Sequence, residues 1–159
     1  MTDPRFWKIM KFALIGVLIA VLVISRQGNR TSNTDFDTMA QAVTQAADMS
    51  KMQEAVNQML KRLYGLDSTV YDGIVLHYPT TNMGAEELLL VRMADVSQTE
   101  ELKTAIEGRL ATQKKAFDGY GADQTAMLEK SIITIRGNYA LFISADDPVS
   151  VQQAFDKNF

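Results

Sequence analysis

Residues 132–144 read IITIRGNYALFIS, two apolar runs separated by Gly137 and Asn138. Glycine and asparagine both tolerate a positive φ, which tight two-residue hairpin turns require. The segment therefore predicts a β-hairpin with strands over residues 132–135 and 139–144. Because a hairpin joins antiparallel neighbours, we expect the sheet to be antiparallel at this point.

A second pair of strands is predicted earlier in the chain. Residues 70–78 are rich in β-branched and aromatic side chains that alternate along the run, and Pro79 closes it. After a polar loop that contains Gly84, residues 88–93 form a nearly continuous apolar run. This run is expected to be the antiparallel neighbour of the first, which brings the predicted sheet to four strands.

Helical spacing precedes these strands. From residue 35 to residue 64, apolar side chains recur at intervals of three and four, and the pattern favours two helices over one. Ser50 and Gln53 match a capping box that would start the second helix, and Gly65 would end it.

Three further helices are expected between and after the strands. Ser97 and Glu100 match a capping box ahead of a run with apolar helical spacing. A short helix is predicted at residues 123–130, and Pro148 suits the first turn of a last helix. The predicted order is ααββα(α)ββα, an α+β domain whose four-stranded antiparallel sheet is covered on one face by helices.

The N-terminal region predicts a membrane anchor. Residues 12–24, FALIGVLIAVLVI, carry no charge, and with their flanks they are at the short end of what spans a bilayer as a helix. Three basic residues precede the run and two follow it, which favours a cytoplasmic N-terminus. The sequence thus predicts a cytoplasmic N-terminus (1–8), a transmembrane anchor (9–25), a tether (26–34) and an extracytoplasmic domain (35–159).

Two alternatives to a retained anchor remain. A cleavable signal peptide also has a basic start and a short apolar core, although residues 23–25 match a cleavage site only loosely. A buried helix of a soluble protein is the other alternative, but the apolar run has no polar face. With either an anchor or a signal peptide, the following domain is exported.

Charge and cysteine content exclude several classes of function. Residues 1–30 carry five Lys or Arg and one Asp, whereas residues 31–159 carry eleven Lys or Arg and eighteen Asp or Glu. So acidic a domain is a poor nucleic-acid binder, because neutralising phosphates requires a basic surface. The chain has no cysteine, so it lacks disulfides, thiolate metal ligands, a cysteine nucleophile and a lipid-acceptor cysteine.

Four stretches resemble a known family. They are KRLYGLD at residues 61–67, GAEELLL at 84–90, the run 110–117 with Tyr120, and Gly137-Asn138-Tyr139 before an apolar strand. Together, over residues 36–156, they resemble the bacterial family catalogued as domain of unknown function 4358. The resemblance implies a short exported protein of Gram-positive bacteria, tethered by a lipoprotein signal or an N-terminal helix. It implies no catalytic residues, and the missing lipobox cysteine favours the helical anchor here.

The residues themselves predict no catalytic, cofactor-binding or metal-binding residue. His77 is the only histidine, and no second ligand-type residue stands at metal-binding spacing from it. Adjacent carboxylates such as Asp146 and Asp147 point in different directions, and these two precede a helix start, where negative charge is favourable. An enzyme is therefore disfavoured.

Five residues are candidates for contact with a partner protein: Met39, Val43, Tyr120, Asn138 and Tyr139. Met39 and Val43 share a helix face that would contact a partner if the helix docked loosely, and would otherwise pack on the sheet. Tyr120 stands between two glycines. For Tyr139, the alternative to partner contact is a strand residue with its ring on the sheet. For Asn138, the alternative is a residue that only shapes the turn.

Two hypotheses of function follow. The first is a membrane-tethered, non-catalytic interaction or assembly module of the bacterial cell envelope, whose partner is an envelope protein. The second is a small-ligand or cell-wall-binding domain, or a hydrolase with an unconventional site, which predicts a concave pocket with converging polar groups. A sensory ectodomain is a weaker hypothesis, because so few residues precede the apolar run.

Overall fold

The computed structural model of the chain describes residues 14–16, 31–55 and 57–159. The chain divides into two compact units, Met1–Arg30 and Thr31–Phe159. In the first unit, only residues 14–16 are described, and they are helical. The elements from α2 to α6 belong to the second unit.

The predicted anchor falls mainly on residues that the structure leaves undescribed. Except for residues 14–16, the N-terminus (1–8), the anchor (9–25) and the first part of the tether (26–30) lie outside the described residues. Within residues 14–16, 31–55 and 57–159, no helix combines the length and apolar character that crossing a bilayer requires.

The second unit has more strands than the sequence predicted. Its elements are, in order, α2 (Phe36–Ala46), β1 (Met52–Glu54), α3 (Asn57–Tyr64), η1 (Ser68–Val70), β2 (Tyr71–Pro79), β3 (Glu87–Met93), η2 (Val96–Gln98), α4 (Thr99–Phe117), α5 (Ala122–Glu129), β4 (Ile132–Arg136), β5 (Tyr139–Ser144) and α6 (Pro148–Asn158).

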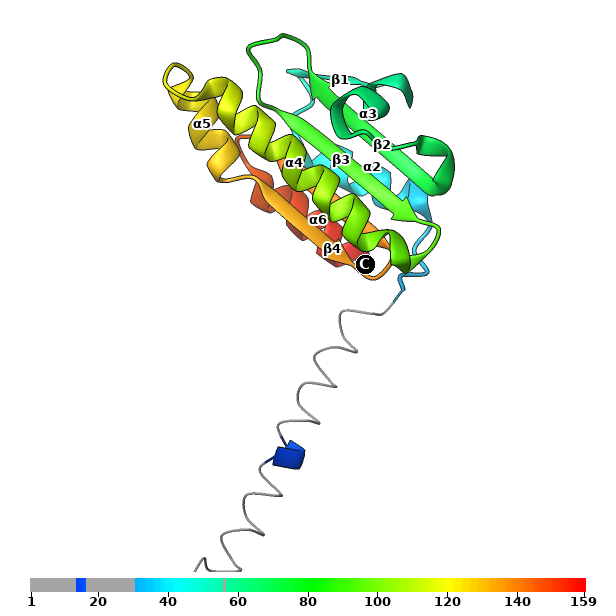
Figure 1. Cartoon of the computed structure of the whole chain (residues 1–159). Helices are drawn as coiled ribbons and strands as arrows, with labels where there is room; N and C mark the ends of the chain where they lie inside the picture. The colour runs from blue at the N-terminus through cyan, green and yellow to red at the C-terminus, as the bar shows by residue number, and fades with distance from the viewer. Residues whose placement is uncertain (1–13, 17–30, 56) are drawn as a thin grey trace, which may run out of the picture. The chain divides into compact units, whose positions relative to one another are not determined.

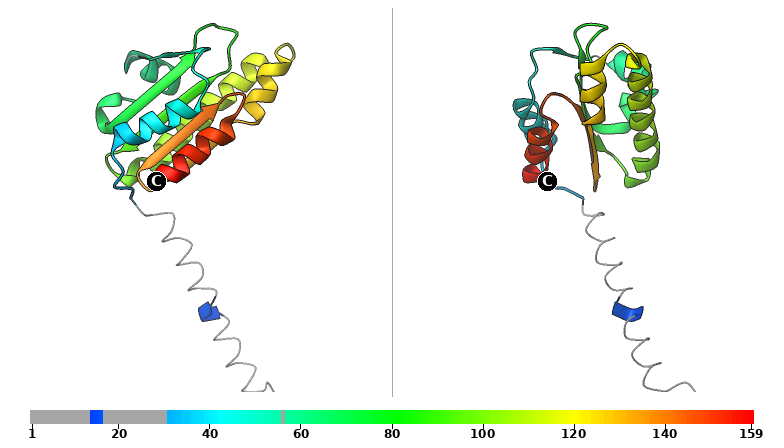
Figure 2. Two further views of the ribbon diagram at one scale, coloured as in Figure 1. Left: turned by 180° about the vertical axis from the view of Figure 1, so that it is seen from behind. Right: turned by 90° about the vertical axis from the view of Figure 1, so that its left-hand side faces the viewer.

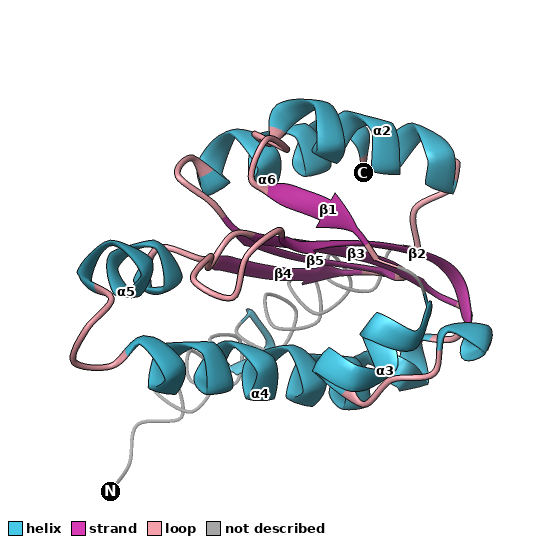
Figure 3. Cartoon of the chain, turned by 90° about the horizontal axis from the view of Figure 1, so that it is seen from above, coloured by secondary structure: helices cyan, strands magenta, loops and turns pink. Residues whose placement is uncertain are grey.

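The strands form one antiparallel sheet in the order β1-β2-β3-β5-β4 (Figures 1 and 3). The two predicted pairings, β2 with β3 and β4 with β5, are confirmed. In the centre of the sheet, Leu89 of β3 lies opposite Leu76 of β2 and Phe142 of β5. The prediction of four strands is wrong by one, and β1 is the additional strand.

Helices cover both faces of the sheet, not one as the sequence predicted (Figures 2 and 3). On one face, Leu90 packs in a cluster with Phe155 of α6 and Met39 of α2. On the other face, Leu89 packs in a cluster with Ile106 of α4. A strand buried on both faces loses the alternation of apolar and polar residues, which explains the continuous apolar runs of β3 and β5.

The extra strand β1 lies where the second helix was expected to begin. Met52 pairs with Pro79 of β2, and the Ser50 N–H donates to Asp48 Oδ1. The predicted capping box of Ser50 and Gln53 is therefore wrong, and α3 begins only after β1. Three residues carry too short a pattern to be recognised as a strand, yet they pair with β2 and form the edge of the sheet.

The long helix α4 is confirmed, but its capping box lies two residues earlier than predicted. The Ser97 N–H donates to Asp95 Oδ1 at 2.7 Å, and the Asp95 N–H donates to Gln98 Oε1 at 3.1 Å. These bonds cap the short helix η2, which leads directly into α4. The predicted box of Ser97 and Glu100 does not form, because the 3-10 turn shifts the start of the helical segment.

The turn between β4 and β5 uses only one of its two residues in a left-handed conformation. Arg136 pairs with Tyr139, so the loop has two residues. Gly137 has a φ of 55°, whereas Asn138 does not have a positive φ. Glycine at the first central position is typical of a type II′ turn.

Replacing Gly137 with alanine is expected to lower the free energy of unfolding by about 1 kcal/mol, because a Cβ is strained at this φ. Gly108 is the matched control, since it lies in the exposed middle of α4 with open space around an added Cβ. Alanine at position 108 is expected to raise the free energy of unfolding by up to about 1 kcal/mol. Chemical denaturation measures the free energy of unfolding of the two variants. A decrease of similar size in both would contradict the assignment of a positive φ to Gly137.

Candidate functional site

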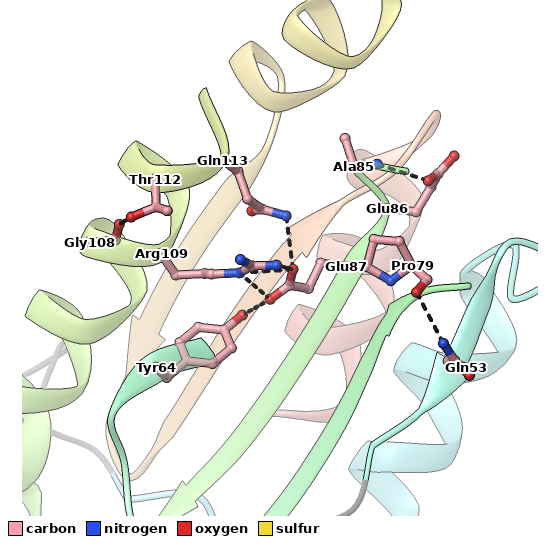
Figure 4. A network of polar contacts seen from close by, with 10 residues as sticks. All are labelled: Gln53, Tyr64, Pro79, Ala85, Glu86, Glu87, Gly108, Arg109, Thr112 and Gln113. Atoms are coloured by element: carbon pink, nitrogen blue, oxygen red, sulfur yellow. Dashed lines mark hydrogen bonds and ion pairs between the residues drawn. The ribbon is translucent and has the colours of Figure 1, made fainter. Parts of the chain in front are cut away.

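Glu87, at the start of β3, is a fully buried carboxylate surrounded by polar side chains (Figure 4). Arg109 of α4 donates from Nε to Oε1 at 3.1 Å and from Nη2 to Oε2 at 2.6 Å. The Tyr64 hydroxyl donates to Oε1 at 2.5 Å, and Gln113 Nε2 donates to Oε2 at 2.9 Å. These four residues, the Glu87 cluster, join α3 and α4 to the central strand.

The Glu87 carboxylate has no acceptor capacity left for an outside group, because each oxygen accepts at least two of these bonds. Burial, with the charge of Glu87, raises the pKa of Tyr64 well above its ordinary value, so the phenol keeps its proton. Burial disfavours the charge on Arg109, but the hydrogen bond and charge of Glu87 outweigh it and raise the pKa of Arg109. The cluster is therefore suited to fixing side chains in position.

A cavity of about 300 Å³ lies beside the cluster. Residues of α3, α4, the end of β2 and the β2–β3 loop line it, and we call it the α3–α4 cavity. Arg109 and Gln113 belong both to its wall and to the Glu87 cluster, while Met59, Leu63 and Phe117 give it apolar surface. Its volume is at the lower end of the range for ligand pockets.

Two arginines and no carboxylate are found among the described residues that line this cavity. Arg62 of α3 is exposed and forms no ion pair with any described residue. Arg109 bonds Glu87 through Nε and Nη2, and its Nη1 makes no hydrogen bond within the described part of the chain. The cavity is thus locally positive in an acidic domain.

Gln113, which lines the cavity, has an unpaired acceptor. Its Oε1 is buried and has no hydrogen-bond partner among the described residues. Because an ionised carboxylate only accepts, Gln113 presents Nε2 to Glu87, and this leaves Oε1 without a donor. An unpaired buried acceptor costs about 1–3 kcal/mol, so a donor from a bound molecule would be favourable here.

The residues that line the cavity are at the end of the sheet opposite to the point where the chain enters the domain. Ser32 N–H donates to Asn138 Oδ1 in the β4–β5 turn, and Thr34 Oγ1 donates to the Asn158 carbonyl. That turn adjoins the C-terminal end of β3, whereas Glu87 is at its N-terminal end. These ends of β3, Glu87 and Met93, are about 20 Å apart at a rise of about 3.4 Å per residue.

Two of the predicted contact residues are in the core. Met39 and Val43 are fully buried between α2 and the sheet. Their burial agrees with the interpretation that they pack on the sheet, and it leaves them no surface for a partner.

The two candidates in the hairpin have structural contacts. Tyr139 is fully buried, and its hydroxyl donates to the Thr34 carbonyl at 2.9 Å. Asn138 accepts the Ser32 N–H in the same region. Both residues hold the segment that enters the domain, which is the last part of the predicted tether (26–34).

Tyr120 is the candidate that the structure brings to a cavity. Its side chain is 66% exposed, follows the end of α4 and lines the α3–α4 cavity. It also lines a neighbouring hollow at the α4–α5 turn. Of the five candidates, Tyr120 alone combines exposure with a concave surface.

Within the described residues, no group of three His, Asp or Glu side chains is arranged to hold a metal ion. His77 lies on β2 opposite Leu88 and Glu54. Its partial burial lowers the pKa of the imidazole, although the charge of Glu54 opposes this.

Sequence reasoning missed the Glu87 cluster. The available signals were a glutamate at the head of an apolar run and the spacing of Arg109 and Gln113, four residues apart on one helix face. Neither signal identifies the tertiary partner, because residue 87 meets residues 64, 109 and 113 only after α3 and α4 pack on the same face of the sheet.

A family model described as domain of unknown function (DUF4358) matches residues 45–145. The match spans Arg62, Tyr120 and all four residues of the Glu87 cluster. Comparison with curated proteins and with solved structures gave no match.

Proposed function

The chain belongs to the family of domain of unknown function DUF4358, and from this premise we propose that it is a non-catalytic protein-interaction module. In this proposal, the α3–α4 cavity holds a segment of the partner protein. The observation that carries the proposal is a concave, locally positive surface beside an exposed tyrosine.

The composition of the rim supports contact with a protein. Tyr120 is 66% exposed, and Met83, which stands between the lining residues Asn82 and Gly84, is 57% exposed. Tyrosine, methionine and arginine are enriched in protein interfaces, and tyrosine and arginine are enriched among the residues that contribute most to binding. The saturated Glu87 carboxylate supports a role in binding, because it fixes Arg109 and has no free lone pair for proton transfer.

We further propose that the module is exported and tethered to the cell membrane of a Gram-positive bacterium by residues 9–25, with its partner in the cell envelope. The apolar run in the sequence supports the anchor. In this proposal, the cavity that contacts the partner is at the end of the sheet away from Ser32, where the chain enters the domain.

A small-ligand or cell-wall-binding domain is the second candidate. The α3–α4 cavity also favours it, because Arg62, Arg109 and Gln113 bring polar groups to one concave surface.

Site-specific crosslinking in living cells tests the proposal. The full chain is expressed in a Gram-positive host with a photoreactive phenylalanine analogue in place of Tyr120. The control places the analogue at Val149, which is 52% exposed on α6. We expect a protease-sensitive adduct from position 120 and none from position 149.

Three outcomes decide between the candidates. A protein adduct specific to position 120 supports the interaction module. An adduct that only a wall-degrading enzyme removes supports the second candidate. Equal adducts at both positions, or none at either, would contradict both.

A further inference from the structure

The charge of the α3–α4 cavity differs from that of a second hollow, which is lined by charged residues of both signs. In the hollow between the β2–β3 loop and α5, Lys51 pairs with Glu86 at 3.5 Å and with Asp146 at 3.6 Å. In the α3–α4 cavity, Arg62 has no carboxylate partner among the described residues. Arg62 is therefore free to pair with an anionic group of a bound molecule.

The second arginine of this cavity is held in position. The side chain of Arg109 is 16% exposed and is fixed by Glu87 at 2.6 Å, which leaves Nη1 unpaired on the side away from the carboxylate (Figure 4). A guanidinium that is already fixed loses little further conformational entropy when it binds an anion. Carboxylates and phosphates both match the planar donor geometry of a guanidinium, and the carboxylate is the one that an unmodified peptide carries.

Gln113 adds a requirement for a hydrogen-bond donor. Its buried Oε1 has no partner among the described residues, so a ligand N–H would satisfy it if the side chain turned Oε1 toward the cavity. A peptide provides a backbone N–H within one residue of a carboxylate. Met59, Leu63 and Phe117 offer apolar contact for a neighbouring side chain.

We propose that the α3–α4 cavity binds a peptide segment of the partner that carries a carboxylate next to an apolar residue. Arg62, with Nη1 of Arg109, would bind the carboxylate, and Gln113 Oε1 would accept a backbone N–H. This inference rests on the proposed function, and it names the class of segment that the interaction module recognises. The carboxylate comes from a chain terminus or from an acidic side chain.

Methyl NMR tests whether the cavity binds peptides of this class, with a carboxylate next to an apolar residue. The full chain is labelled at its methionine methyl groups and held in detergent micelles. Met59 lies in the cavity, whereas Met39 and Met93 are buried elsewhere and serve as internal controls. The probes are acetyl-Gly-Leu with a free carboxylate, its C-terminal amide, acetyl-Leu-Glu amide and a neutral oligomer of N-acetylglucosamine. We expect the two carboxylate peptides to shift the Met59 signal and the amide to bind about tenfold more weakly.

Two matched variants assign the effect to the arginine. Arg62→Ala is expected to remove the tenfold difference between acid and amide, because it removes the free cation. Lys61→Ala, which removes a neighbouring charge outside the cavity, is expected to preserve the difference. The stronger of the two carboxylate peptides tells whether a chain terminus or an acidic side chain is preferred.

Equal binding of acid and amide, or an equal loss for both peptides in Arg62→Ala, would overturn the inference. So would a shift of Met59 by the sugar oligomer and by no peptide. If no probe binds but position 120 still crosslinks to a protein in cells, the inference about the carboxylate fails while the proposed function stands.

Discussion

Replacing Glu87 with alanine is expected to lower the free energy of unfolding by about 3–5 kcal/mol, because it leaves the charge of Arg109 without its buried partner. The loss has further parts, since the Tyr64 hydroxyl and Gln113 Nε2 also lose their acceptor. Urea denaturation of the full chain, followed by circular dichroism, measures the change.

Lys103→Ala is the matched control for this variant. Lys103 and Glu107 form an ion pair at 4.0 Å whose side chains are about half exposed. Removing so exposed a pair is expected to cost less than about 1 kcal/mol. A loss of similar size in Glu87→Ala and Lys103→Ala would contradict the description of the Glu87 cluster as a buried brace between β3, α3 and α4.

Leu89→Ala and Leu90→Ala are each expected to lower the free energy of unfolding by about 2–5 kcal/mol, since each leaves a cavity in a close-packed region. These neighbours on β3 are both fully buried and point to opposite faces of the sheet. Chemical denaturation of both variants therefore tests whether helices cover both faces.

Asp72→Ala on β2 is the control, because Asp72 is an exposed strand residue. It is expected to change stability by no more than about 0.5 kcal/mol. A large loss in only one of the two leucine variants would indicate a sheet with a single covered face, as the sequence predicted.

Local patterns in the sequence were sufficient for much of the fold. The hairpin followed from Gly137 between two apolar runs, and α4 from apolar positions spaced along a helix face. Both signals lie within about twenty residues and do not depend on the rest of the chain. The same holds for Pro148 at the start of α6.

The predictions from the sequence were wrong or incomplete where contacts between residues far apart in the chain determine the structure. β1 exists because residues around Met52 pair with the end of β2, and no local pattern marks that pairing. The second covered face depends on where α2 and α6 pack. The Glu87 cluster and the α3–α4 cavity depend on α3 meeting α4, so Arg62 and Gln113 could not be recognised from their neighbours in sequence.

The central claim is that the α3–α4 cavity is the surface that contacts the partner. Its most direct test is to measure the yield of the crosslinked adduct from position 120 in two charge-reversal variants. Arg62→Glu places an anion beside the cavity, whereas Lys61→Glu makes the same change one residue away and outside it. We expect the yield to fall about tenfold or more in Arg62→Glu and to stay unchanged in Lys61→Glu. Equal yields in the two variants would show that the partner does not contact the cavity.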